Sequence, residues 1–281
     1  MTMKFPVMPP GFTRAERKIA EYISAHTEAF LFMGIAQLSE TLQLSEATIS
    51  RFARHVGCSD FKELKKVVMD QAALQGPAAK VAGTLLGEEE DFLAGWIRRQ
   101  QMYLEKTLEE LDREEFGRAV EALAAAGSVY IHGKNASVSL AGLLMFRLRR
   151  LGIRVNLIPS GGTEIFEGLS QAKEGDLVVM FSFSKVSAEG KAILEWSREA
   201  GYRTLSFTSR RYVPDEERAD LNLFIYRGEE QEYHSAAAPA AVLDALVLAL
   251  SRRLGAESGQ KLDRLQRMKK SFPPGRSQET N

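Results

Sequence analysis

Cysteine is nearly missing from this sequence of 281 residues, in which Cys58 is the only one. A single thiol excludes an internal disulfide and any metal cluster built from cysteines, and it fits a reducing cytosol. The formal net charge is zero, because 37 basic residues balance 37 acidic ones. No global field therefore attracts the protein to nucleic acid or to a membrane, and any affinity for DNA must come from a local patch.

Long apolar runs are also absent. No stretch approaches the roughly 20 residues of a membrane span, and residues 1–11 carry prolines where a signal peptide needs an apolar core. We therefore expect a cytoplasmic protein with no membrane partner. The apolar fraction of 44% is ordinary for a globular protein, and the length suggests about two domains.

Residues 34–56 have the pattern of two helices joined by a tight turn. Apolar residues recur at helical spacing in each half. They are Ile35, Leu38 and Leu42 in the first half and Ile49, Phe52 and Val56 in the second. Gln43 and Leu44 form the predicted turn, and Ser45 is a good N-cap because its hydroxyl accepts from an otherwise unpaired backbone N–H. Gly57 provides the left-handed residue that ends the second helix.

The second of these helices has the polar face expected of a helix that reads DNA. Short polar side chains near its start reach base edges, and arginines bind guanine edges or phosphates. Residues 51–66 hold five lysines and arginines against two acidic residues, which concentrates positive charge where phosphates would lie. The predicted contacts to double-stranded DNA are Ser45, Glu46, Thr48, Ser50, Arg51, Arg54, Lys62 and Lys65. The alternative is a helical hairpin in an ordinary bundle with its lysines on a solvated face.

The segments on either side also predict helix. Thr13 and Glu16 have the spacing of a capping box, in which each side chain satisfies the other residue's backbone N–H. Residues 59–73 place apolar side chains at helical spacing, with Lys62, Lys65 and Lys66 on the opposite face. The first part of the chain is therefore predicted to be all helix.

Further along the chain, short apolar runs alternate with helical stretches. The predicted strands are 129–132, 154–158, 177–183, 204–208 and 221–226. The predicted helices between and after them include 136–151, 188–200 and 240–254. This alternation predicts an α/β three-layer sandwich with a five-stranded parallel sheet and helices on both faces. Ligands of such folds bind at the carboxyl ends of the strands.

These patterns divide the chain into four parts. We expect a helix-turn-helix DNA-binding domain over residues 1–76 and the α/β domain over 112–255. Between them, residues 77–111 form a predicted linker, with an acidic run at 87–91 and an amphipathic connecting helix from Phe92 onward. Residues 256–281 form a polar tail, which is expected to be disordered after a further helical stretch.

Two strand-end loops of the α/β domain carry groups that suit an anion. The first strand continues into Gly133, Asn135 and Ser137 at the start of a helix, where backbone N–H groups favour negative charge. The third continues into Ser182, Ser184, Lys185 and Ser187, which supply hydroxyls and an ammonium. Both loops reach the same edge of the sheet, so we predict a phosphate-binding site there. The alternative is that these serines only cap helices.

The sequence offers no firm catalytic or metal site. The four histidines have no metal-ligand spacing, and no nucleophile elbow or Walker-type loop is present. His132 lies at a strand end, and His234 follows three glutamates; a Glu/His pair is what a sugar isomerase uses for proton transfer. Packing of His132 under a loop is the simpler interpretation. We assign no catalytic residue, no metal and no cofactor.

Taken together, these motifs resemble the RpiR family of bacterial transcriptional regulators. The first part of the resemblance lies in ERKIAEYI (16–23) and in IAQLSETLQLSEATISRFARHVGCSDFKELKK (35–66). EGDLVVMFSFS, YRTLSFTS and ERADLNLFIY look like strands of that family's second domain. The resemblance implies an N-terminal helix-turn-helix domain followed by a SIS domain, which is a phosphosugar-binding sandwich that usually dimerises.

The chain departs from that family's loops at a few positions. Lys185 stands where the third-strand loop usually has glycine, and Ser187 stands where it usually has threonine. Lys134 and Asn135 interrupt the usual glycine-rich pattern of the first loop, although Gly133 and Ser137 match it. Losing a glycine removes close backbone approach, while the added lysines supply positive charge.

Three interpretations of function remain open at this point. The leading one is a regulator of carbohydrate metabolism that binds operator DNA and senses a phosphorylated sugar. The others are a phosphosugar isomerase with a helical appendage, and a DNA-binding regulator whose SIS domain serves only as a dimerisation platform. The helices at 136–151 and 240–254 carry more apolar residues than one sheet contact buries, which predicts a homodimer or a larger homo-oligomer.

Overall fold

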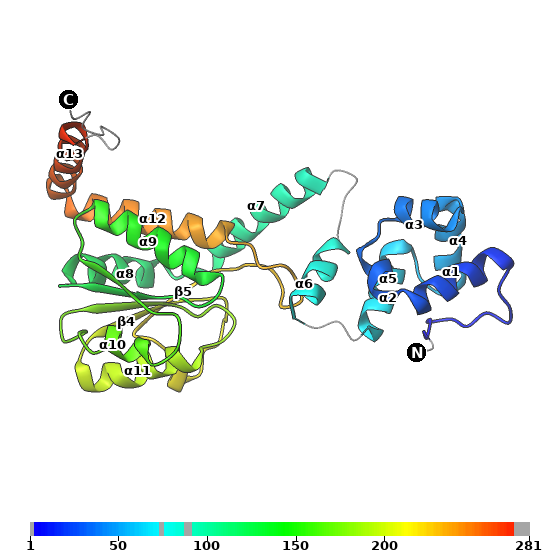
Figure 1. Cartoon of the computed structure of the whole chain (residues 1–281), viewed down its shortest axis with the longest axis horizontal. Helices are drawn as coiled ribbons and strands as arrows, with labels where there is room; N and C mark the ends of the chain where they lie inside the picture. The colour runs from blue at the N-terminus through cyan, green and yellow to red at the C-terminus, as the bar shows by residue number, and fades with distance from the viewer. Residues whose placement is uncertain (1–2, 73–75, 87–91, 273–281) are drawn as a thin grey trace, which may run out of the picture. The chain divides into compact units, whose positions relative to one another are not determined.

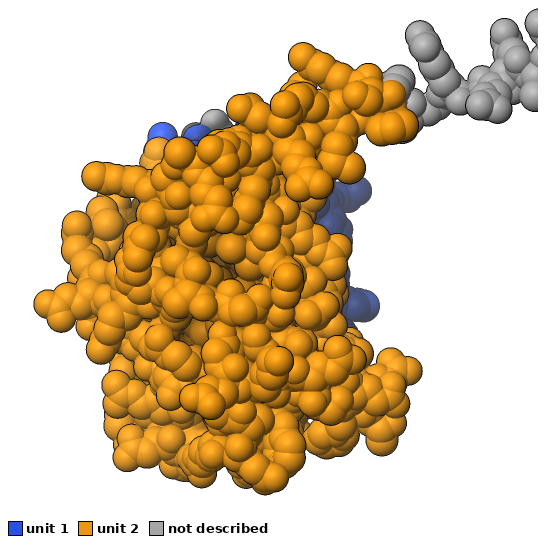
Figure 2. All heavy atoms as spheres, turned by 90° about the vertical axis from the view of Figure 1, so that its left-hand side faces the viewer, with its two compact units in different colours: residues 1–99, 228–234 blue, residues 100–227, 235–281 orange. Residues whose placement is uncertain are grey.

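The computed structural model describes residues 3–72, 76–86 and 92–272 (Figure 1). The chain forms two compact units, which Figure 2 shows in separate colours. The first comprises Met1–Arg99 and Gly228–His234, and the second comprises Gln100–Arg227 and Ser235–Asn281. The predicted acidic run at 87–91 and the end of the predicted tail, beyond Phe272, lie outside the described residues. Within the described ranges, no helix has the length and apolar character that crossing a membrane requires.

The first unit is helical. Its elements are α1 (Arg14–Ala25), α2 (Thr27–Phe32), α3 (Ile35–Leu42), α4 (Glu46–His55), α5 (Phe61–Gln71), α6 (Gly76–Leu85) and the first part of α7 (Phe92–Glu110). The predicted capping box starts α1, since Thr13 N donates to Glu16 Oε2 at 2.8 Å and Glu16 N donates to Thr13 Oγ1 at 3.3 Å. The core includes the fully buried Ile49 and Phe52 of α4.

Helix α6 occupies a segment that sequence analysis assigned to the linker. It packs on α2 and α5, and the side chain of Ala82 is fully buried in the core of the first unit. Apolar burial of this kind stabilises a short helix that its own propensity would not. The first unit therefore contains a further helix beyond the predicted helix-turn-helix.

The second unit confirms the predicted α/β fold. Its strands are β1 (Val129–His132), β2 (Val155–Ile158), β3 (Leu177–Phe181), β4 (Arg203–Thr208) and β5 (Leu221–Phe224). All neighbouring pairs are parallel, and the order across the sheet is β2-β1-β3-β4-β5. Strands β1 and β3 are buried at every position, as expected of central strands that are covered on both faces.

Helices cover both faces of this sheet (Figure 1). The core on one face includes residues of α7, α8 (Arg113–Ala125), α9 (Ser137–Arg150) and α12 (Ala237–Leu254). The core on the other includes residues of α10 (Glu164–Leu169) and α11 (Ala188–Ala200). A short 3-10 turn, η1 (Asp215–Glu217), precedes β5, and α13 (Ala256–Ser271) follows α12.

The strand order fixes where a ligand can bind. The chain leaves β1 toward β2 on one side, while β3 lies on the other side of β1. In open α/β sheets of this order the loops diverge between β1 and β3, and the carboxyl ends of these strands border a crevice. His132 at the end of β1 is paired in register with Met180 near the end of β3. The two loops predicted to bind an anion begin at this point.

Candidate functional site

The α3–α4 pair has the local geometry predicted from its sequence. Gln43 takes the left-handed conformation that turns the chain, at φ 50°. The hydroxyl of Ser45 caps α4 by accepting a hydrogen bond from Thr48 N at 3.2 Å. Gly57 has φ 89°, and a Cβ atom at this position would lie 2.6 Å from Val7 Cγ2. Both its conformation and its close contact therefore require glycine there.

The exposed face of α4 carries a connected row of polar groups. The hydroxyls of Ser45 and Thr48 lie 2.8 Å apart, and Arg51 Nη2 donates to Thr48 Oγ1 at 3.3 Å. Arg51 and Arg54 are exposed, while Ile49 and Phe52 hold the opposite face in the core. Packing thus fixes the helix and leaves this row accessible. Glu46 is exposed and Ser50 is partly exposed, so they remain available beside it.

The structure corrects the prediction for Lys65. Its side chain is only 5% exposed, whereas Lys62 and Lys66 on the same helix are exposed. Helix α5 packs against α2, α4 and α6, so more of its circumference is covered than a single apolar stripe indicates. Lys65 is therefore not on the surface that a phosphate would approach, and the placement of this residue on the exposed face was wrong.

In the second unit, the loop after β1 is shaped by its backbone. Gly133 is buried, and a Cβ atom there would lie 2.6 Å from the carbonyl oxygen of Ser137. Asn135 takes the left-handed conformation at φ 53°. The residue before α9 is Ala136, whose side chain makes no capping hydrogen bond. Ser137 is thus the first helical residue rather than a cap, which the capping interpretation did not expect.

The loop after β3 divides its hydroxyls between two roles. Ser187 caps α11 by accepting a hydrogen bond from Gly190 N at 3.2 Å, as the capping interpretation predicted for these serines. Ser182 is buried, and its backbone N–H still donates to the Phe207 carbonyl at 2.9 Å. Strand β3 itself ends at Phe181, two residues earlier than predicted. Ser184 and Lys185 are exposed at the tip of the loop.

An ion pair that the sequence did not predict joins the loop after β1 to the first turn of α11. Lys134 Nζ lies 2.7 Å from Glu189 Oε1, and the Glu189 side chain is 16% exposed. Gly161 of the β2–α10 loop is close as well, because a Cβ atom there would lie 3.6 Å from the same oxygen. The Lys134 ammonium, followed by the Glu189 backbone N–H and the Ser187 hydroxyl, lowers the pKa of Glu189 to about 2. The carboxylate is therefore ionised at neutral pH.

The two histidines of the isomerase interpretation differ in their surroundings. His132 is 2% exposed, and burial lowers its pKa against the opposing effects of the Glu189 carboxylate and the Pro159 carbonyl. Its buried ring is therefore neutral at neutral pH. His234 belongs to the first compact unit, where its Nδ1 lies 3.3 Å from Lys80 Nζ. Among the described residues, no group of three or more His, Cys, Asp and Glu side chains is placed to hold a metal ion.

Comparison with known proteins identifies both parts of the chain. The profile of the helix-turn-helix domain of the rpiR family matches residues 6–75, and that of the SIS domain matches residues 122–249. The chain therefore combines a helix-turn-helix domain of the rpiR family with a SIS domain. It is a DNA-binding transcriptional regulator with a SIS domain. This assignment favours the helix-turn-helix interpretation over an ordinary helical hairpin.

Individual relatives agree with this architecture of the RpiR family. A protein named as an uncharacterized HTH-type transcriptional regulator, TTE0211 of Caldanaerobacter subterraneus subsp. tengcongensis, is 28% identical over 255 residues, 88% of each chain. The Vibrio vulnificus NanR protein in complex with ManNAc-6P shares the fold over 92% of this chain and 94% of its own, with 20% identity and a TM-score of 0.58. The sugar isomerase domain of an RpiR transcription factor from Sphaerobacter thermophilus matches 63% of this chain and 99% of its own, with 24% identity and a TM-score of 0.59.

Proposed function

We propose that the protein binds operator DNA through α4 and that a small phosphorylated sugar, bound at the carboxyl ends of β1 and β3, controls this binding. The observation that carries the proposal is the meeting of two polar loops at the point where the strand order changes direction. Backbone N–H groups at helix starts, together with Lys185, provide positive potential for a phosphate. A regulator of this kind acts in the cytoplasm, where operator DNA is accessible.

Within this site, which we call the effector site, the residues have distinct proposed roles. The hydroxyl groups of Ser137, Ser182 and Ser184 donate hydrogen bonds to the phosphate. Gly133 and Asn135 shape the first loop. Ser187 keeps α11 capped and contributes its helix start rather than its own hydroxyl. Lys185 adds charge from the loop tip.

Titration calorimetry of the full chain with hexose, pentose and amino-sugar phosphates tests this proposal. The V. vulnificus NanR protein is described in complex with ManNAc-6P, so that compound belongs in the panel. Ser184→Ala should weaken binding about tenfold, because a hydrogen bond to a charged group contributes roughly 1.5–3 kcal/mol and the exposed position of Ser184 places it at the lower end. Ser170→Ala, at the end of α10, is the matched control and should change nothing.

Lys185 provides a sharper test of the same site. If its ammonium contacts the phosphate, Lys185→Gly weakens binding; if its side chain only blocks the crevice, the same change strengthens binding. No binding of any panel compound by the wild type, together with binding by Lys185→Gly, would mean that the SIS domain has lost its sensing role. The protein would then be a DNA-binding regulator with a dimerisation platform.

We also propose that the protein senses its sugar phosphate without converting it. An isomerase needs a base that is free to take a proton, but the Glu189 carboxylate is held by Lys134 at 2.7 Å and its pKa is about 2. Such a carboxylate is a weak base at neutral pH. Product analysis by NMR after prolonged incubation with each panel compound checks this. More moles of isomerised sugar than of protein would contradict it.

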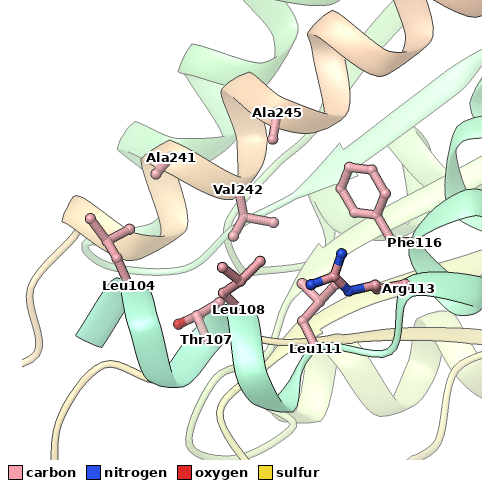
Figure 3. A pocket seen from close by; sticks show the side chains of 9 residues that line it. All are labelled: Leu104, Thr107, Leu108, Leu111, Arg113, Phe116, Ala241, Val242 and Ala245. Carbon is pink, nitrogen blue, oxygen red and sulfur yellow. The ribbon is translucent and has the colours of Figure 1, made fainter. Parts of the chain in front are cut away.

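The second unit has a further surface that supports a homodimer. An apolar groove of about 420 Å³ lies between α7, α8 and α12, with Leu108 and Val242 facing it (Figure 3). Leu108 is 63% exposed and Leu248 of α12 is 70% exposed. Exposed apolar surface that remains after the chain has folded favours a partner. Some of the apolar residues that the sequence assigned to a partner interface are covered within the unit itself, since Leu144 of α9 is fully buried in its core.

Sedimentation of the full chain at micromolar concentration tests the homodimer. Leu108→Glu and Leu248→Glu should each shift the equilibrium toward the monomer, because they bury a charge in the proposed interface. Met268→Glu on α13, also at an exposed apolar position, is the control. A wild-type protein that sediments as a monomer refutes this part of the proposal.

A further inference from the structure

Arg227 is a partly buried cation just beyond the end of β5. Its guanidinium carbon lies 3.8 Å from the centroid of the Phe183 ring, and its Nε donates to Ser209 Oγ at 3.1 Å. Burial alone lowers the pKa of Arg227 to about 10, with no carboxylate of the described residues among the causes. Cation–π and hydroxyl contacts thus hold this side chain in place of an ion pair.

Both groups that hold Arg227 are tied to the loop after β3. Phe183 lies between Ser182 and Ser184, two of the proposed phosphate donors. The backbone N–H of Ser209 donates to the Phe183 carbonyl at 2.9 Å, and the Ser209 hydroxyl donates to the Ile225 carbonyl at 2.7 Å. A movement of the loop at Phe183 therefore changes the contacts of Arg227 from two directions.

Arg227 is also the last residue of the second unit before the chain crosses into the first. Residues 228–234, here called the crossing segment, belong to the DNA-binding unit although they follow β5 in sequence. The chain returns to the second unit at Ser235, just before α12. The chain therefore passes from one unit to the other three times, counting the boundary inside α7 between Arg99 and Gln100.

Several specific contacts fix the crossing segment within the first unit. Tyr233 N donates to Thr84 Oγ1 of α6 at 2.6 Å, and the rings of Tyr233 and Trp96 meet edge to face with centroids 6.0 Å apart. A Cβ atom on Gly83 would lie 2.6 Å from the Gln231 carbonyl oxygen, so α6 and the crossing segment are in close contact there.

Helix α6 leads from these contacts to the DNA-binding surface. It packs on α5, and α5 packs on α4. Packed elements of this kind pass on a displacement because their interiors are dense and contain few voids. The crossing segment thus has a continuous path of contacts to α4 inside a single compact unit.

We propose that Arg227 is a positioning residue that couples the loop after β3 to the crossing segment, so that a ligand at the effector site changes the placement of α6 and thereby DNA binding. This inference rests on the proposed function for its ligand, but the coupling between loop and segment does not require a ligand. A ligand changes DNA affinity only if it binds the DNA-bound and DNA-free arrangements of the protein with different affinities. DNA then changes the affinity for the ligand by the same factor.

A ligand-free experiment on the full chain tests the coupling itself. Arg227→Met keeps the apolar part of the side chain and removes the guanidinium, and Arg203→Met at the exposed start of β4 is the matched control. Amide hydrogen exchange over residues 228–234 should become about fivefold faster or more in Arg227→Met, because local opening requires less free energy. In a Trp196→Phe background, acrylamide quenching of Trp96 should rise in the same variant. Exchange and quenching at wild-type values in Arg227→Met overturn the proposal.

A second experiment measures coupling between the two sites. An operator fragment is selected from random DNA with the wild-type protein, and its affinity is measured with and without each sugar phosphate of the panel. Arg227→Met and Thr84→Val should reduce the ligand-dependent ratio of DNA affinities to about one, while affinity for the sugar phosphate stays within about threefold, because coupling and binding are separate free energies. Thr27→Val, which removes a comparable hydroxyl bond from the start of α2 to the Ile23 carbonyl of α1, is the control for Thr84→Val.

The outcomes separate this inference from the proposed function. If no sugar phosphate binds the wild type, the proposed function fails, and hydrogen exchange still decides whether Arg227 controls the crossing segment. If Arg227→Met reduces sugar-phosphate affinity more than about tenfold, Arg227 is a direct ligand and the positioning role is overturned. If both variants keep the wild-type ratio of DNA affinities, the crossing segment does not carry the signal.

Discussion

The polar face of α4 and the effector site present their charges in opposite ways. On α4, Arg51 and Arg54 are exposed on a helix that its apolar face holds in the core. In the effector site, Lys134 is already paired with Glu189 at 2.7 Å. The proposed DNA-binding surface is therefore preformed, whereas an anion entering the proposed effector site must compete with a carboxylate of the protein. The two surfaces should respond differently to substitution, salt and pH.

The largest expected effect comes from removing the support of the preformed surface. Phe52 is fully buried and lies 5.7 Å from Phe5 and 6.0 Å from Phe12 between ring centroids. Phe52→Ala should lower the free energy of unfolding of the first unit by about 3–5 kcal/mol through lost burial and the cavity left behind. Urea unfolding followed by Trp96 fluorescence in a Trp196→Phe background measures this, and DNA binding should be lost with it.

The same variant shows whether the two surfaces depend on one another. Trp196 lies in α11 of the second unit, so a Trp96→Phe background reports that unit alone. Its unfolding transition and its affinity for a sugar phosphate should be unchanged in Phe52→Ala. An equal loss in both units would mean that the surfaces are not supported separately.

A smaller effect is expected from single contacts on α4. Arg51→Ala should reduce operator affinity by about 1–3 kcal/mol, the usual cost of a lost base or phosphate contact. Gel-shift titration at fixed salt concentration measures it, with Arg17→Ala on α1 as a control for loss of surface charge. Operator binding at the wild-type level by Arg51→Ala would remove α4 from the DNA interface.

The lysines of α5 separate exposed charge from buried charge. Lys62→Ala should lower the slope of log affinity against log salt concentration by about one, because one phosphate contact and its counterion release are lost. Lys65→Met should leave that slope unchanged, since its side chain is buried. A reduced slope for Lys65→Met would restore Lys65 as a phosphate contact.

Removing the competing carboxylate should improve anion binding. In Glu189→Gln, Lys134 is released from its partner and the negative charge near the phosphate is gone. We expect affinity for the sugar phosphate to rise about tenfold, as for a nearby like charge removed from a partly buried site. Calorimetry checks this with Glu195→Gln on the same helix as the control. Weaker binding by Glu189→Gln would mean that this carboxylate contacts the sugar instead.

The smallest effect is a dependence of stability on pH. The pKa of Glu189 is about 2 in the folded protein, below its ordinary value of 4.5. The ion pair therefore stabilises the folded state fully above pH 4.5, and this contribution is lost as the pH falls from 4.5 toward 2. Lys134 is 43% exposed, so solvent screening keeps the contribution small. Unfolding of the second unit is followed by Trp196 fluorescence in Trp96→Phe and in Trp96→Phe/Glu189→Gln. The unfolding midpoints of these two proteins should differ less at pH 3 than at pH 6.

The fold was largely predictable because its signals are local. The turn at Gln43, the cap at Ser45 and the end at Gly57 each depend on residues within a few positions of one another. The parallel sheet also followed from the sequence, since short buried strands alternate with amphipathic helices. Helix α6 was missed because Gly76 and Pro77 are typical of a break, although proline is also well tolerated in the first turn of a helix.

The details of the sites could not be predicted, because they depend on contacts between distant segments. The Lys134–Glu189 pair joins residues that are 55 positions apart, and no spacing rule connects them. Lys65 is buried on a helix that packs against three others, of which α6 was not expected. Ser137 and Ser187 look equivalent in sequence, but only Ser187 caps its helix. The residue types of the effector site were thus foreseeable, while their division of roles was not.

The discontinuity of the DNA-binding unit has a consequence for how such genes change. A domain encoded by one continuous stretch is exchanged between genes by recombination at its two ends. Here, a new stretch for residues 1–99 would bring its own α6 but would meet the resident residues 228–234, whose backbone approaches Gly83 and Thr84. We therefore expect the two parts of this unit to be inherited together, and residues near Gly83 and Gln231 to change together in related proteins.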